Sequence, residues 1–129
     1  MPKQVLLLLT ERWADWEASY AIAEVNSTEE YRVETIAEDK APKVSIGGLR
    51  AEIDHVVDDF SDFGNVAMVI VPGGMNWRTS DHLSIVDFLR RVITADVPVA
   101  AICGATIFLA RNGFLDGIRH TGDNLEYFT

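Results

Sequence analysis

Residues 97–113 read VPVAAICGATIFLARNG, and they decide the fold because a short strand passes directly into a helix within them. The first six residues are apolar and typical of a buried strand, whereas the residues from Gly104 onward favour a helix that ends at Gly113. Cys103, the only cysteine of the chain, lies in the turn between them. A helix N-terminus favours thiolate over thiol, so Cys103 is a candidate nucleophile. The alternative is a small apolar residue that fills a strand end.

The rest of the chain repeats this alternation of strands and helices. Residues 5–9 and 66–71 are continuous apolar runs, which are typical of strands buried on both faces. Residues 31–36 alternate as a further strand, and helical patterns cover residues 14–25 and a stretch from Ser80 or Asp81 to about residue 95. A glycine pair inside residues 43–53 predicts a β-hairpin. We therefore expect one α/β domain over residues 1–129, with a mostly parallel central sheet and helices on both faces.

Composition and charge exclude several classes of protein. The net charge of −9 and the isoelectric point near 4.6 argue against nucleic acid and against an anionic membrane surface as partners. No apolar run approaches the length of a membrane span. One cysteine excludes an internal disulfide and fits a reducing compartment, so we expect a cytoplasmic protein.

In parallel sheets, sites form beyond the carboxyl ends of the strands. Three segments of this chain are expected to meet there, namely residues 10–17, residues 72–74 and the turn at Cys103. The backbone N–H groups of Gly74 and Gly104 could form an oxyanion hole beside the cysteine. The alternative for the glycine pair before Met75 is an ordinary turn.

The motifs at these three places resemble the ThiJ/PfpI family, which lies within the class I glutamine amidotransferase-like superfamily. They read DWE at residues 15–17, VPGG at residues 71–74 and AICGAT at residues 101–106. The resemblance covers nearly the whole chain, in order and in spacing. It implies a flavodoxin-like three-layer sandwich that usually forms a homodimer and needs no cofactor or metal. It also implies a longer chain, so we expect that a C-terminal part of the domain is missing here.

The resemblance further implies roles for individual residues. Cys103 matches the family's nucleophile, Gly74 and Gly104 match the oxyanion donors, and Glu17 matches an acidic residue whose carboxyl touches the sulfur. His120 falls where many members have a histidine beside the site, although it is equally well a bystander. Without the resemblance, Glu17 reads as a solvated helix residue.

The other histidines and the tryptophans have simpler interpretations. His55 and His82 are expected at the surface, and the three histidines and one cysteine show no metal-ligand spacing. Trp16 and Trp77 flank the expected site, where they either form an apolar wall or dimer contact or simply pack.

The implied function is that of a cysteine-dependent hydrolase or amidase acting on a small carbonyl or amide substrate, with glyoxalase-like or deglycase-like reactions included. The residue after the cysteine is Gly104, whereas the peptidase branch has a histidine that completes a dyad there, so amidase or glyoxalase chemistry fits better than proteolysis. One alternative is a redox or stress sensor that works by reversible oxidation of Cys103. A weaker one is a small-ligand binder without turnover.

Overall fold

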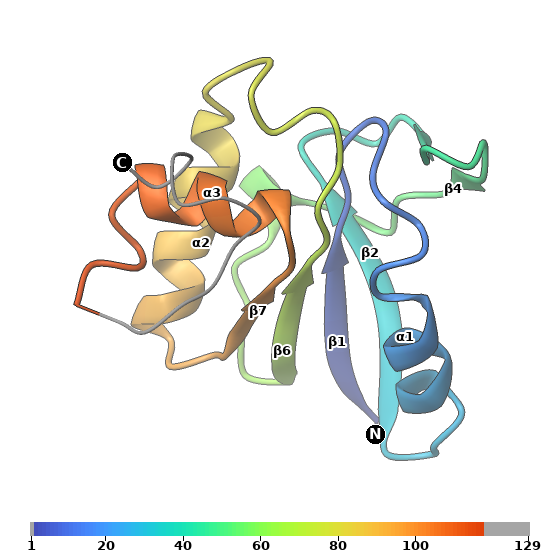
Figure 1. The fold of residues 1–129 in the computed structure, drawn as a ribbon. Helices are drawn as coiled ribbons and strands as arrows, with labels where there is room; N and C mark the ends of the chain where they lie inside the picture. The colour runs from blue at the N-terminus through green and yellow to red at the C-terminus, as the bar shows by residue number, and fades with distance from the viewer. Residues whose placement is uncertain (1, 118–129) are drawn as a thin grey trace.

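The computed structural model describes residues 2–117, which contain a five-stranded, all-parallel sheet in the order β5-β2-β1-β6-β7 (Figure 1). The strands are β1 (Lys3–Leu8), β2 (Tyr31–Ala37), β5 (His55–Val56), β6 (Val66–Val71) and β7 (Val99–Ala101). The central strands β1 and β6 are the two continuous apolar runs. The predicted burial on both faces is confirmed for β1, whereas Ala67 and Met68 of β6 are only partly buried.

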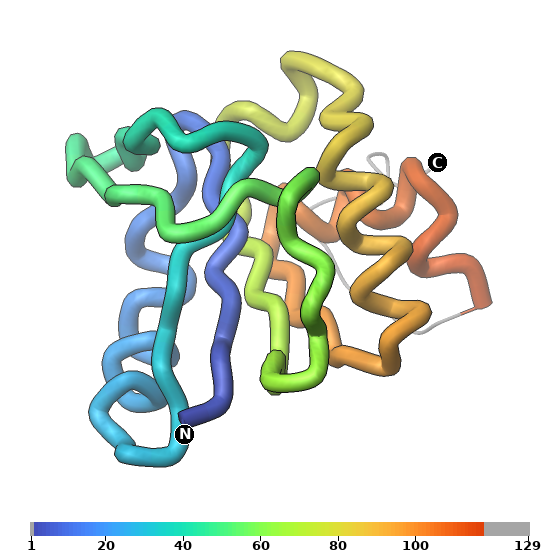
Figure 2. Tube along the Cα trace, turned by 180° about the vertical axis from the view of Figure 1, so that it is seen from behind, coloured from blue at the N-terminus to red at the C-terminus, as the bar shows by residue number. Residues whose placement is uncertain are grey.

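Side chains of β1 alternate between two separate apolar cores, one on each face of the sheet. Leu6 and Leu8 pack with α2 (Leu83–Thr94) and α3 (Gly104–Arg111), whereas Val5 and Leu7 pack on the face that α1 (Ser19–Asn26) covers. The same three layers are visible from behind in Figure 2. The expected flavodoxin-like sandwich, with helices on both faces of a parallel sheet, is therefore confirmed.

The two faces are covered unequally. Helix α2 is strongly amphipathic and inserts five buried side chains into its core, listed as Ile85, Val86, Phe88, Leu89 and Val92. Helix α1, in contrast, has no fully buried residue. In Figure 1 it stands beside β2, and apolar residues of β6 and β7 on its face, among them Met68 and Ala100, remain only partly buried.

Local expectations were met in part. The hairpin is present as β3 (Lys43–Val44) and β4 (Arg50–Ala51), and Gly48 takes the positive φ of +85° that its turn requires. The first helix, however, begins only at Ser19 instead of Ala14, because residues before it form a loop bonded to other segments. The short strand β5 and the 3-10 helix η1 (Val57–Asp59) were not predicted.

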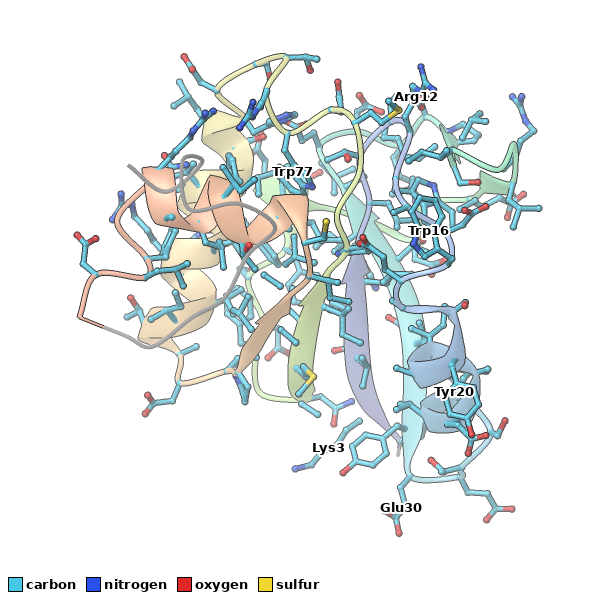
Figure 3. All side chains as sticks on the ribbon, in the orientation of Figure 1. Lys3, Arg12, Trp16, Tyr20, Glu30 and Trp77 are labelled. Atoms are coloured by element: carbon cyan, nitrogen blue, oxygen red, sulfur yellow. The ribbon has the colours of Figure 1, made fainter. Side chains whose placement is uncertain are left out.

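All parallel strands end at one edge of the sheet, and the expected site lies there. Figure 3 shows Arg12, Trp16 and Trp77 towards this edge, with Lys3 and Glu30 at the opposite one. The loop after β1, the loop after β6 and the turn after β7 thus meet, as parallel topology demands.

Candidate active site

Cys103 lies in a strained turn between β7 and α3. Its backbone has φ 51° and ψ −120°, a region that L-residues rarely adopt and that costs about 1–3 kcal/mol. The turn is held on both sides, because Ile102 N donates to Val71 O at 3.0 Å and Thr106 N donates to Cys103 O at 2.9 Å. The Thr106 hydroxyl donates to the same carbonyl at 2.6 Å. These hydrogen bonds hold the backbone of Cys103 in its unusual conformation.

The loop after β1 pairs with the glycine loop after β6. Ala14 N donates to Gly73 O at 2.9 Å and Met75 N donates to Arg12 O at 3.1 Å, which makes Trp13 and Gly74 a non-hydrogen-bonded antiparallel pair. In such a pair each residue's own N–H points away from the partner strand. The Gly74 N–H is therefore not consumed by this pairing.

The β3–β4 hairpin anchors the loop that carries Glu17. Arg12 N donates to Val44 O at 2.8 Å, and Ile46 N donates to Trp13 O at 2.9 Å. The Ser45 hydroxyl donates to Asp15 Oδ2 at 2.7 Å. Asp15 of the DWE motif thus has a structural role, because its carboxylate binds the loop to the hairpin.

Glu17 is half-buried and points towards the elbow. Its Oε1 accepts a hydrogen bond from Gly73 N at 2.7 Å. A Cβ atom placed on Gly73 would lie 2.8 Å from that oxygen and 3.1 Å from Gly104 N, so both atoms face the same small space. This position differs from that of a solvated helix residue, because Glu17 precedes α1 and contacts the glycine loop.

Gly74 and Gly104 are also close to each other. A Cβ atom placed on Gly104 would lie 3.6 Å from Gly74 O and 4.0 Å from Gly74 N. The first N–H groups of a helix have no partner inside it, so α3 itself does not use the Gly104 N–H. The backbone amides of Gly74 and Gly104, which are expected as oxyanion donors, therefore lie next to the same small space.

A pocket of about 300 Å³ opens at this place. It is lined by Gly74, Met75, Trp77, Arg78, Gly104 and Ile107. The Trp77 side chain in this lining is fixed, because it is 5% exposed and donates a hydrogen bond through Nε1 to Pro72 O at 3.1 Å. Its ring also packs against Phe108 in a tilted arrangement, with 4.6 Å between ring centroids. The pocket gives a small molecule access to both glycine amides.

The family model of the DJ-1/PfpI family matches residues 3–125, nearly the whole chain. The chain belongs to the DJ-1/PfpI family. The resemblance on which the three motifs were interpreted is thereby confirmed.

Individual relatives of this DJ-1/PfpI protein are longer than the chain. It is 33% identical over 121 residues to the "Uncharacterized protease YdeA" of Bacillus subtilis, covering 94% of the chain and 59% of that relative. It is 32% identical to "Uncharacterized protease YoaZ" of the same organism, covering 97% of the chain and 62% of that relative. The chain thus spans about three-fifths of the length of these two curated relatives.

Solved structures show the same fold. The DJ-1 superfamily protein Atu0886 from Agrobacterium tumefaciens superposes with a TM-score of 0.88 at 27% identity, over 97% of this chain and 66% of that one. A thiJ/pfpI family protein from Bacillus anthracis superposes with a TM-score of 0.82 at 32% identity, over 99% of this chain and 63% of that one.

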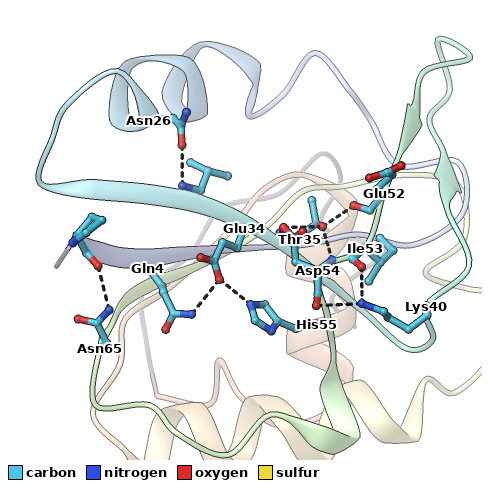
Figure 4. Close-up of polar contacts among 12 residues, drawn as sticks. Gln4, Asn26, Glu34, Thr35, Lys40, Glu52, Ile53, Asp54, His55 and Asn65 are labelled. Carbon is cyan, nitrogen blue, oxygen red and sulfur yellow. Dashed lines mark hydrogen bonds and ion pairs between the residues drawn. The ribbon is translucent and has the colours of Figure 1, made fainter.

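The structure separates the remaining sequence-predicted residues. Trp77 packs in the core and lines the pocket, whereas Trp16 is 62% exposed. His55 is half-buried, with Nε2 at 2.6 Å from Glu34 Oε1 on the neighbouring strand β2 (Figure 4). Its strand β5 and the strand β7 before Cys103 are at opposite edges of the sheet. His120 lies outside the described residues. Within residues 2–117, no three His, Cys, Asp or Glu side chains are grouped as metal ligands would be, and no helix there is long and apolar enough to cross a membrane.

The expectation that His82 lies at the surface is wrong. His82 is 4% exposed, and its ring packs edge-on against Trp77 and Phe108. It also replaces Ser80 or Asp81 as the N-cap residue of α2, with a left-handed φ of 48° and no side-chain cap. No local pattern indicates this burial, because Glu38 and Phe108, which contact the ring, are far from His82 in the sequence.

His82 has an acceptor at each ring nitrogen. Nδ1 lies 2.8 Å from Glu38 Oε1, and Nε2 lies 2.8 Å from the backbone oxygen of Asn76. Because both partners accept hydrogen bonds, the arrangement favours the doubly protonated ring. The hydrogen bond with Glu38 raises the pKa of His82, and the same bond lowers the pKa of Glu38. The charged pair ties the end of β2 to the loop that carries Trp77.

This pair predicts a pH dependence of stability. The His82 contribution is fully present below its ordinary pKa of 6.5 and is lost as pH rises through the raised folded value. The Glu38 contribution is present above 4.5 and is lost as pH falls through the lowered one. The excess unfolding free energy of the wild type over His82→Gln should therefore be largest between these values and shrink towards pH 9. Urea unfolding at several pH values measures it, and a difference independent of pH would contradict the assignment.

Proposed function

We propose that this DJ-1/PfpI protein is a cysteine-dependent hydrolase or amidase that acts on a small carbonyl or amide compound. The observation that carries the proposal is the strained backbone of Cys103, which directly precedes Gly104, one of the two glycines that line the pocket. Strain of this kind is retained where the surroundings impose it, and it is concentrated at functional sites. The names of the protease-like relatives support the same broad class.

The chemistry follows from the positions of the groups. The Cys103 thiolate adds to the carbonyl carbon, and the carbonyl electron pair moves to oxygen, beside the amides of Gly74 and Gly104. With an amide, the oxyanion collapses, the C–N bond breaks and the amine leaves with a proton. Water then hydrolyses the thioester, which releases the acid and restores the thiol.

In this scheme we assign the proton transfer to Glu17. Its Oε1 is held by the Gly73 N–H, so the carboxyl is oriented towards the elbow. A hydrogen bond donated to the sulfur at this place would favour the thiolate. His120 remains a predicted partner for the same step, and the expected homodimer also stays a prediction.

The absence of the peptidase dyad narrows the substrate class. Gly104 follows the cysteine, and its lack of a side chain leaves its amide open to the pocket. Small amides and α-oxoaldehydes therefore suit the site better than peptides. Methylglyoxal and simple primary amides are the first compounds to assay.

The proposal is tested by the pH dependence of Cys103 alkylation with iodoacetamide. We expect a midpoint below about 8.5, the ordinary value for a cysteine thiol. Glu17→Gln should shift the midpoint, because the side chain held by the Gly73 N–H faces the elbow and the change replaces its carboxyl group by an amide. Glu24→Gln, the same change at an exposed position of α1, is the matched control and should leave it unchanged. A thiol that reacts only above the ordinary value, or only on unfolding, would overturn the proposal.

A further inference from the structure

The pocket at the elbow contains a single charged side chain among the described residues. Met75, Trp77 and Ile107 give it apolar walls, and Arg78 is the one cation that the described part of the chain contributes. A guanidinium recognises carboxylate oxygens with two parallel N–H groups, which an apolar wall cannot do. The cation therefore stands within the space that also borders Gly74 and Gly104.

Arg78 also borders the adjoining pocket of about 450 Å³, where Trp77 is again shared. Among residues 2–117, the charged residues that line that second pocket are Arg78, Arg111 and Asp81, so cations outnumber the one carboxylate there. This local excess is opposite in sign to the whole chain, whose net charge is −9. An overall field of that sign repels anions, and an anionic substrate would need such a local cation to reach the site.

Resting on the proposed function, we infer that Arg78 binds an anionic group of the substrate, so that the site takes small carbonyl compounds bearing a carboxylate. The volume of the pocket suits such a compound, because about 300 Å³ equals roughly ten water molecules. The carbonyl carbon then faces Cys103, the oxygen faces the two glycine amides, and the carboxylate faces Arg78. A carboxylate next to the reacting carbonyl, as in an α-oxo acid, is the simplest arrangement.

Iodoacetate and iodoacetamide provide the test, because they are nearly equal in size and differ in one negative charge. In both reactions the thiolate displaces iodide, so an S–C bond forms and a C–I bond breaks. The measured quantity is the ratio of the iodoacetate rate to the iodoacetamide rate. We expect Arg78→Gln to lower this ratio about fivefold, as for a partly exposed charge pair. The Arg78→Lys variant should retain part of the wild-type ratio. Added NaCl should lower the ratio of the wild type but not that of Arg78→Gln.

Arg50→Gln is the matched control, since it removes the same charge from the exposed hairpin strand β4. A second readout uses glyoxylate, whose aldehyde adds reversibly to a thiolate and whose carboxylate would meet Arg78. Glyoxylate should protect Cys103 from iodoacetamide at a lower concentration in the wild type than in Arg78→Gln.

The outcomes separate this inference from the proposed function. An unchanged ratio in Arg78→Gln, or an equal fall in Arg50→Gln, would overturn the role of Arg78 while leaving an activated cysteine in place. A Cys103 that iodoacetamide fails to modify below about pH 8.5 would instead overturn the proposed function itself. Circular dichroism of each variant shows that the fold is retained.

Discussion

Replacing Cys103 by alanine or serine is expected to abolish turnover of any substrate of the site, lowering the rate by on the order of a thousandfold or more. Alanine has no nucleophile, and a serine hydroxyl is hardly ionised at neutral pH, whereas a thiol is partly thiolate. Because both replacements keep a Cβ atom in the strained turn, they should leave the free energy of unfolding within about 1 kcal/mol of the wild type. Loss of methylglyoxal or amide turnover, measured beside urea unfolding, checks this expectation.

Cys103→Gly sharpens the test. Glycine normally destabilises a strand or helix by about 0.5–1 kcal/mol relative to alanine. At φ 51° and ψ −120° the order should reverse, because only glycine adopts this conformation without strain. We expect Cys103→Gly to be more stable than Cys103→Ala by about 1 kcal/mol, and both to be inactive. If the glycine variant were the less stable of the two, the turn would not be strained by its surroundings. If the serine or alanine variant kept its turnover, the nucleophile would lie elsewhere.

Gly74→Ala is the second change with a large expected effect. The added Cβ atom would lie 2.8 Å from Arg12 O and 3.0 Å from Trp13 Cα, both of them backbone atoms that cannot move away cheaply. Relief requires the loop after β1 and the loop after β6 to separate. We expect a loss of about 1–3 kcal/mol in the free energy of unfolding. Displacing the Gly74 amide should also lower turnover by about a hundredfold, as for loss of one oxyanion donor.

Gly64→Ala is the control for this change. Its Cβ atom would lie 3.3 Å from Asp62 Oδ1, the end of an exposed side chain that can turn aside. Its effect on stability should stay within about 0.5 kcal/mol, without loss of turnover. Thermal unfolding and the same assay measure both variants. A Gly74→Ala protein with wild-type stability and rate would show that the two loops are not held together as described.

The helix boundaries show where sequence patterns fail. The apolar period continues upstream of Ser19, yet Ala14 and Trp13 take part in backbone pairing with the glycine loop, about sixty residues away in the chain. The spacing of apolar residues indicates which residues face a core. A helix and a loop held by hydrogen bonds can both bury residues at that spacing. The strand β5 was not predicted for a related reason. Two residues are too few to show an alternating pattern, and they form a strand only because they pair with β2.

The candidate site divides in the same way. The small residues around Cys103 and the glycine pair after β6 could be recognised from the chain alone, because turn geometry demands particular residue types locally. Glu17 was singled out only through the resemblance to the family. Other features of the site became visible only in the tertiary structure. Glu17 accepts a hydrogen bond from the Gly73 N–H, and Arg78 and Trp77 line the pocket beside Gly104. These contacts join segments far apart in sequence.

By itself, the amino-acid sequence determined the parallel α/β architecture, the hairpin and the elbow at Cys103, because apolar runs and glycine turns act over a few neighbouring residues. Only the tertiary structure decided the burial of His82, which depends on Glu38 across 44 residues and on the Asn76 carbonyl. It also decided the strain at Cys103 and the grouping of Arg78 with the glycine amides. The physical reason is that a buried polar group is stable only where partners satisfy it, and no local pattern records a partner as distant in the sequence as Glu38.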